Sequence, residues 1–348
     1  MRNRIFAFVA VCAFALNAVG TTFADTKSNN SSRQMNQLVA LLPASDGVVI
    51  LDVQRILNEA APQILAGKPL VLGEINAKID EIRDKTGLDA RQFEQIVIGV
   101  ATKNFTAQKI DLEPVFLARG KYSANALIAV AKLASNGKYR EEKIGSRTIY
   151  VFNGKEIVAQ NHPRTKNSWI NGMIDRLLNS LSNEIAVTSL DGNTLAFGSL
   201  ARVRETFETK SRVSVEVLNL ATRKPNAVIS FGARLPNGLS KFIDLENDEL
   251  GKTLDSIRQM SGAVEVSANN TAISMMTKTL NAEQAQSLHN TLDFLQKFGK
   301  NFVKGESEDK KVLLRMIENA RITRSQAEVS LDLQIPQNDI NILLAGVK

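Results

Sequence analysis

The chain has 348 residues, of which 44% are hydrophobic and 23% are charged, a composition typical of a globular protein. Its 43 basic and 36 acidic side chains give a net charge of +7. This excess is too small and too dispersed for a nucleic-acid-binding protein. Cys12 is the only cysteine, which excludes an internal disulfide and a cysteine-based metal site.

Residues 1–24 have the three-part pattern of a cleavable signal peptide. Arg2 and Arg4 provide the positive start, and an apolar run follows from Ile5 to Leu16. This run is much shorter than the about 20 residues of a membrane-spanning helix. Thr22 and Ala24 are small residues three positions and one position before a possible cut, so we expect cleavage between Ala24 and Asp25. The mature protein is then periplasmic or secreted, with no transmembrane anchor after cleavage.

Residues 25–40 are polar and are expected to form a flexible leader. An N-terminal α+β domain is predicted over 41–212. Its first strand is 48–53, and amphipathic helices follow over 56–65 and 73–86. Further elements are strands at 96–102 and 114–121, a helix at 124–134, hairpins at 139–151 and 185–197, and helices at 169–181 and 200–208. The second hairpin carries Asp191-Gly192 at its turn, a pair typical of tight turns with positive φ.

A C-terminal α+β domain is predicted over 213–348. Expected strands are 227–233, 263–266, 272–275 and 327–334, and expected helices are 235–242, 248–260, 281–302, 311–320 and 339–344. Each domain thus runs strand, helix, strand, strand, helix, strand. This order predicts two βαββαβ-like halves, of the split βαβ or ferredoxin-like type, with extra hairpins in the first half.

Several segments resemble uncharacterised bacterial exported-protein families. They are Leu42-Pro43-Ala44, the run 46–53, Lys85-Thr86-Gly87-Leu88-Asp89 and the run 220–230. The resemblance extends over most of residues 41–345. It implies an envelope protein of Gram-negative type, with no assigned activity and no site residues to transfer.

Short patterns that suggest catalysis lack the context that catalysis requires. Gly251-Lys252-Thr253 ends like a phosphate-binding loop, but Glu246 occupies the position of the loop's first glycine. Ser135-Asn136-Gly137-Lys138 matches Ser-x-x-Lys, yet Ser135 closes a helix instead of opening one. His162 and His289 stand apart in the sequence. We therefore predict no catalytic, metal-binding or cofactor-binding residues, and no cofactor.

The sequence favours a non-enzymatic envelope protein that binds or scaffolds a protein partner. A second hypothesis is a carrier of an apolar or lipid-like ligand, because two apolar helix stripes are able to enclose a cavity. The walls of that cavity would be Trp169, Ile170, Ile174, Leu178, Leu292, Leu295 and Phe298. A third, weaker hypothesis is an envelope hydrolase that uses His162 or His289 beside a serine and a carboxylate.

Overall fold

The computed structural model describes residues 37–87, 89–105, 110–153, 184–208, 212–238, 240, 248–299, 303 and 307–345. The predicted signal peptide, its expected cleavage site and the helix expected over 169–181 lie outside these residues. The chain forms two compact units that are not continuous in sequence. Unit 1 contains Leu51–Ala77 and Asn219–Lys348, and unit 2 contains Arg33–Ile50 and Lys78–Leu218.

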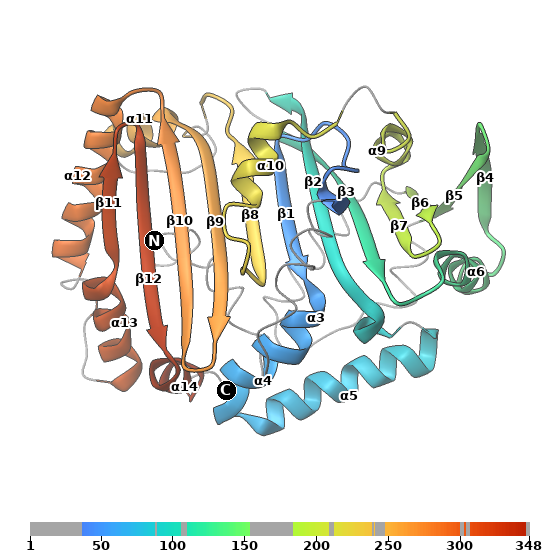
Figure 1. Cartoon of the computed structure of the whole chain (residues 1–348), viewed down its shortest axis with the longest axis horizontal. Helices are drawn as coiled ribbons and strands as arrows, with labels where there is room; N and C mark the ends of the chain where they lie inside the picture. The colour runs from blue at the N-terminus through green and yellow to red at the C-terminus, as the bar shows by residue number, and fades with distance from the viewer. Residues whose placement is uncertain are drawn as a thin grey trace. The chain divides into compact units, whose positions relative to one another are not determined.

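Unit 2 is built on strands that follow the order β1-β2-β3-β7-β6-β5-β4 (Figure 1). Neighbouring strands from β2 to β4 in this order are all paired antiparallel. The strands are β1 (Gly47–Asp52), β2 (Phe93–Phe105), β3 (Ile110–Gly120), β4 (Tyr139–Ile144), β5 (Arg147–Asn153), β6 (Glu184–Asp191) and β7 (Thr194–Gly198).

Two helices cover opposite faces of this part of unit 2. Successive strand residues point to opposite faces: Ala186 packs with α9 (Leu200–Glu205), whereas Val187 packs with α6 (Ala124–Ala134). Serines cap both helices: Ser123 accepts from the Ala126 amide and Ser199 from the Arg202 amide. The helix α6 ends where Asn136 and Gly137 adopt positive φ, the conformation that closes many helices.

Unit 1 has strands in the order β11-β12-β10-β9-β8, with antiparallel pairing throughout. The strands are β8 (Ile229–Arg234), β9 (Ile257–Ser267), β10 (Asn270–Thr279), β11 (Arg321–Ser325) and β12 (Glu328–Pro336). Their helices are α3 (Val53–Arg55), α4 (Ala61–Ile64), α11 (Asp248–Ser256), α12 (Ala282–Gly299), α13 (Glu308–Asn319) and α14 (Gln337–Ala345), with single turns at Ile56–Ala60 and Leu65–Gly67. Two more helices, α5 (Pro69–Thr86) and α10 (Val215–Ala221), each have residues in both units.

One core cluster of unit 1 joins segments far apart in the sequence. Ile64 from α4 packs with Ile335 from β12 and with Ile340 and Leu344 from α14. A second cluster places Ala285 and Leu288 of α12 against Ile257 and Val329. Leu288 and Val329 were assigned to apolar patterns of a helix and a strand from the sequence, whereas Ile335 lies just beyond the expected strand and Ile257 was expected in a helix.

The α+β class is confirmed, since helices accompany extensive antiparallel pairing. The ferredoxin-like halves stay a prediction, and so do the domain limits 41–212 and 213–348; the compact units group residues 51–77 with 219–348. The helix expected over 248–260 was predicted too long, because Ile257–Met260 belong to strand β9. Strand β11 and helix α10 were not foreseen.

Candidate functional site

The seven proposed wall residues are only partly within the described structure. Trp169, Ile170, Ile174 and Leu178 lie outside it. Leu292 packs beside the core cluster of α12, β9 and β12. Leu295 and Phe298 are each 47% exposed on α12, so the described structure brings no wall together from these three residues.

An exposed apolar surface lies near the end of α12. We define the α12 patch as Phe294, Leu295 and Phe298, which are 56%, 47% and 47% exposed. Residues spaced by three or four positions share one side of a helix, so Phe298 lies beside both Leu295 and Phe294, and the ring centroids of Phe294 and Phe298 are 4.3 Å apart. Among the other described side chains, Leu70, Val71 and Ile82 are exposed on α5, whereas Leu112, Leu133 and Val215 are single exposed apolar residues on separate elements.

The orientation of α12 explains why this patch faces outward. The side-chain amide of Gln296 donates to the carbonyls of Ile317 and Ala320, at 2.8 and 2.6 Å. These bonds fix that side of α12 against the end of α13. Residues two positions from Gln296 lie about 200° around the helix, which directs Phe294 and Phe298 away from α13.

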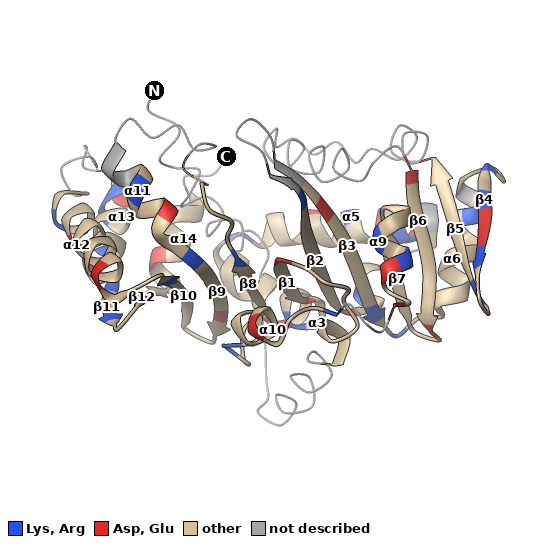
Figure 2. Cartoon of the chain, turned by 90° about the horizontal axis from the view of Figure 1, so that it is seen from above, with Lys and Arg blue, Asp and Glu red and all other residues tan. Residues whose placement is uncertain are grey.

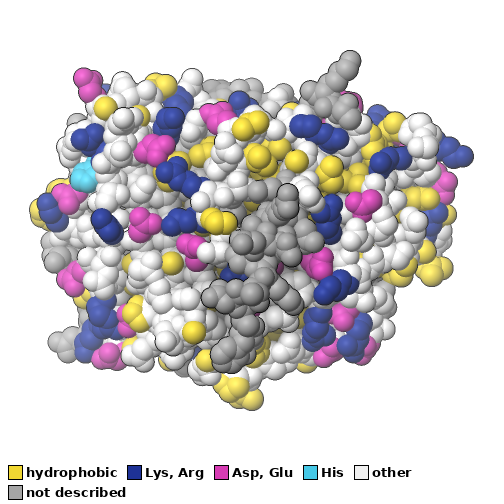
Figure 3. Space-filling model, in the orientation of Figure 1, with side chains coloured by type: hydrophobic (Ala, Val, Ile, Leu, Met, Phe, Trp, Pro, Cys, Tyr) yellow, Lys and Arg dark blue, Asp and Glu magenta, His cyan; other side chains and the backbone are white. Residues whose placement is uncertain are grey.

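The lysine within the α12 patch sequence is paired inside its own helix. Lys297 binds Asp293 at 2.7 Å, one helical turn away. Acidic and basic residues are also interspersed along the described ribbons in Figure 2, and on the face drawn in Figure 3. The described part of α12 therefore places a neutralised lysine beside the apolar rings.

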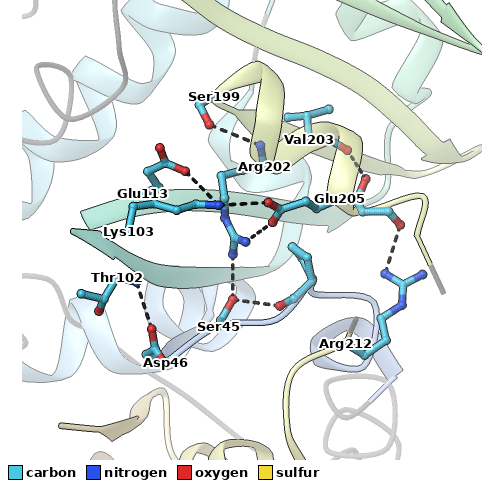
Figure 4. Close-up of polar contacts among 12 residues, drawn as sticks. Ser45, Asp46, Thr102, Lys103, Glu113, Ser199, Arg202, Val203, Glu205 and Arg212 are labelled. Atoms are coloured by element: carbon cyan, nitrogen blue, oxygen red, sulfur yellow. Dashed lines mark hydrogen bonds and ion pairs between the residues drawn. The ribbon is translucent and has the colours of Figure 1, made fainter. Parts of the chain in front are cut away.

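Unit 2 contains a buried charged cluster around Arg202 of α9 (Figure 4). Arg202 is only 1% exposed. One guanidinium nitrogen donates to Ser45 Oγ at 2.9 Å, and the other donates to Glu205. Lys103 lies 3.2 Å from the Glu205 carboxylate and 3.7 Å from that of Glu113. Two cations and two carboxylates thus balance one another.

This cluster holds the segment before β1 in place. Ser45 Oγ donates to the Pro43 carbonyl at 2.9 Å while accepting from Arg202. The close approach depends on Gly99, where a Cβ atom would lie 2.6 Å from Ser45 Oγ. Arg212 adds bonds to the carbonyls of Leu41 and Thr206. Because the charges are balanced and no base accompanies Ser45, we interpret the cluster as structural.

The described residues contain no group of three His, Cys, Asp or Glu side chains arranged to hold a metal ion. His289 lies on α12, and its Nδ1 is buried without a hydrogen-bond partner; His162 lies outside the described structure. Over the same residues, no helix is both long and apolar enough to span a membrane.

No protein-family model matches the chain, and no curated protein matches it either. Among solved structures, crystal form III of TP0453 is similar over 89% of this chain and 98% of that chain, with a TM-score of 0.41 and 11% identity. Crystal form IV of TP0453 covers 88% of this chain and 96% of its own, with a TM-score of 0.43 and 11% identity. A likeness at this level establishes neither a shared function nor a shared ligand.

Proposed function

We propose that the chain is an exported, non-enzymatic envelope protein that binds a protein partner through the α12 patch. The observation that carries this proposal is the pair of adjacent, half-exposed phenylalanine rings beside Leu295. Aromatic side chains dominate the binding energy of many protein interfaces, because burying a ring removes a large apolar area from water.

The rim of the α12 patch favours a protein over an anionic membrane as its partner. A membrane surface attracts a helix through unpaired lysines and arginines, whereas Lys297, between Leu295 and Phe298 in the sequence, is paired with Asp293. We therefore expect a partner with an apolar pocket for two rings and little net charge around it. The outward exposure of Leu295 and Phe298 favours such a contact surface over the wall of a ligand cavity.

Site-specific photo-crosslinking in the native host tests this function. A benzophenone side chain would replace Phe294 in one variant and Gln286, an exposed polar residue of the same helix, in a control variant. We expect one discrete adduct with a different protein from position 294 and none from position 286. The same adduct should disappear when Leu295→Lys and Phe298→Ser are added.

Three results would overturn the proposed function. They are no adduct at position 294, the same adduct at position 286, or an adduct that survives the two added substitutions. An adduct of twice the protein's own mass would identify self-association instead of a different partner.

A further inference from the structure

Strand β11 forms one edge of the unit 1 sheet, and its outer side pairs with no other described strand (Figure 1). Four of its five residues are exposed, and Ile322 alone is half-buried, packed beside the core cluster of α12. An edge strand presents unpaired backbone N–H and C=O groups, to which another chain can add a strand. The outer side of β11 is therefore a candidate docking edge.

The register of the β11–β12 hairpin identifies which backbone groups point outward. The two strands are joined by a turn of only two residues, so Ser325 and Glu328 form the first hydrogen-bonded pair of the ladder. Antiparallel pairs alternate between hydrogen-bonded and non-hydrogen-bonded positions. Ile322 and Arg324 occupy the non-hydrogen-bonded positions, so their N–H and C=O groups are directed at the free edge.

The two arginines of β11 give this edge a positive charge. Arg321 and Arg324 are exposed, and neither forms an ion pair with any described residue. The guanidinium of Arg324 donates only to the carbonyl of Gln326, at 3.3 Å. Asp332 lies across from Arg321 in the register without forming an ion pair with it, and Glu328 is bound to an arginine outside β11. Both guanidinium groups are thus available to carboxylates of another chain.

The edge strand of unit 2 has a different charge pattern. In β4, Arg140 binds Glu184 at 2.8 Å, and Glu142 binds Arg204 at 2.5 Å. Charged side chains of both signs, satisfied within the chain, are typical of an edge that is protected against pairing. The arginines of β11 lack such partners among the described residues. A second copy of β11 would bring two further arginines to the same edge, and like charges on paired strands are unfavourable. The pattern therefore favours an acidic strand.

We propose that β11 binds an extended acidic segment of a protein partner as an added strand. Backbone hydrogen bonds to Ile322 and Arg324 would provide affinity, as in other complexes formed by strand addition. Two carboxylates three positions apart would lie on opposite faces of the added strand, where they match Arg321 and Arg324. The proposal does not rest on the α12 patch, because it uses none of the three apolar side chains of that patch.

Fluorescence anisotropy with labelled synthetic peptides and the full mature protein tests this edge. The acidic probe is the peptide Thr-Glu-Val-Thr-Glu-Val. One control peptide has Lys in place of Glu, and the other has the acidic sequence with every backbone amide methylated. We expect the acidic probe to bind about tenfold more tightly than either control. Combining Arg321→Glu with Arg324→Glu should reverse the preference, so that the lysine peptide binds best. Combining Leu295→Lys with Phe298→Ser should leave the binding unchanged.

Amide hydrogen exchange tests whether the probe adds as a strand. In the free protein we expect the amides of Ile322 and Arg324 to exchange faster than that of Thr323, which is bonded to β12. The acidic probe should slow exchange at Ile322 and Arg324 and leave Thr323 unchanged. Circular dichroism will check that each variant is folded.

Five results would overturn the proposal. They are no binding of the acidic probe at millimolar concentration, equal binding of the methylated peptide, a preference for the acidic probe that survives the charge reversal, loss of binding in the variant of the α12 patch, and no protection at Ile322 and Arg324. Self-association of the free protein through the same two amides would also overturn it, and would identify a second copy of the chain as the occupant.

Discussion

The guanidinium of Arg202 donates a 2.9 Å hydrogen bond to the Oγ of Ser45, a residue 157 positions earlier in the chain. Removing a buried ion-pair partner costs about 3–5 kcal/mol, because the remaining charges are left uncompensated. We expect Arg202→Met to destabilise unit 2 by this amount in urea unfolding. Arg204→Met, on the solvent-exposed side of the same helix, should cost much less. Equal effects of the two substitutions would contradict the structural role of the cluster.

Replacing Gly232 and replacing Gly73 by alanine are expected to change the stability of the protein in opposite directions. A Cβ atom at Gly232 would lie 2.4 Å from the Ala221 amide nitrogen, so α10 would have to move away from β8. We expect Gly232→Ala to destabilise the protein by about 1–3 kcal/mol. Gly73 lies exposed in α5 with no atom within 4 Å of such a Cβ, and Gly73→Ala should stabilise by about 0.5–1 kcal/mol. Thermal unfolding of both variants measures the contrast, and a stabilising Gly232→Ala would show that α10 does not pack on β8.

Burial raises the pKa of Tyr122 far above its usual value. Its hydroxyl donates to the Ala118 carbonyl at 2.5 Å. The folded protein therefore keeps this proton at a pH at which the unfolded chain releases it. Stability should fall as pH rises above about 10, by as much as about 1.4 kcal/mol per pH unit from this residue.

Comparison with Tyr122→Phe isolates this contribution from that of the lysines, which titrate in the same range. The variant should lose less stability than the native protein between pH 10 and pH 11 in urea unfolding. Parallel stability curves would show that Tyr122 ionises in the folded state.

Processing of the N-terminus tests the predicted export. We expect protein purified from the envelope of the native host to begin at or near Asp25, because Ala24 is small enough for the signal peptidase. Ala24→Leu should leave the precursor attached to the inner membrane, and Asp25→Asn should be cleaved normally. Recovery of an intact Met1 from native protein would contradict both export and the proposed localisation.

Local sequence patterns predicted most of the elements. Ser123 and Gly137 delimited α6 correctly, and Gly145 marked the β4–β5 hairpin, where its φ is 59°. The Asp191-Gly192 turn was also correctly placed, although Gly192 does not have the expected positive φ. The side chain of Asp191 instead accepts the Asn193 amide at 3.0 Å, which supports the turn in another way.

The missed elements are those whose structure depends on distant residues. Ile257–Met260 continue the apolar spacing of α11, yet they pair with residues of β8 and β10. In strand β11 only Ile322 is half-buried, and the other four residues are exposed. The strand therefore shows no alternation of apolar and polar residues in the sequence. Tertiary pairing decides both cases, and a single sequence does not contain that information.

The candidate sites were predicted only in part. Leu295 and Phe298 were recognised as apolar, but helical periodicity did not distinguish an outward face from a core face. The bonds from Gln296 to α13 settle that orientation.

The core of unit 1 also bears on the order in which the chain folds. Ile64 and Leu65 are fully or almost fully buried, and their cluster is completed by Ile335, Ile340 and Leu344. A growing chain therefore carries the α4 side chains exposed for some 270 residues of synthesis before their partners exist. Contacts of such long sequence separation slow folding and prolong the time in which apolar surface can aggregate. Unit 1 is thus expected to form last, and to depend on a chaperone until the residues of α14 have emerged.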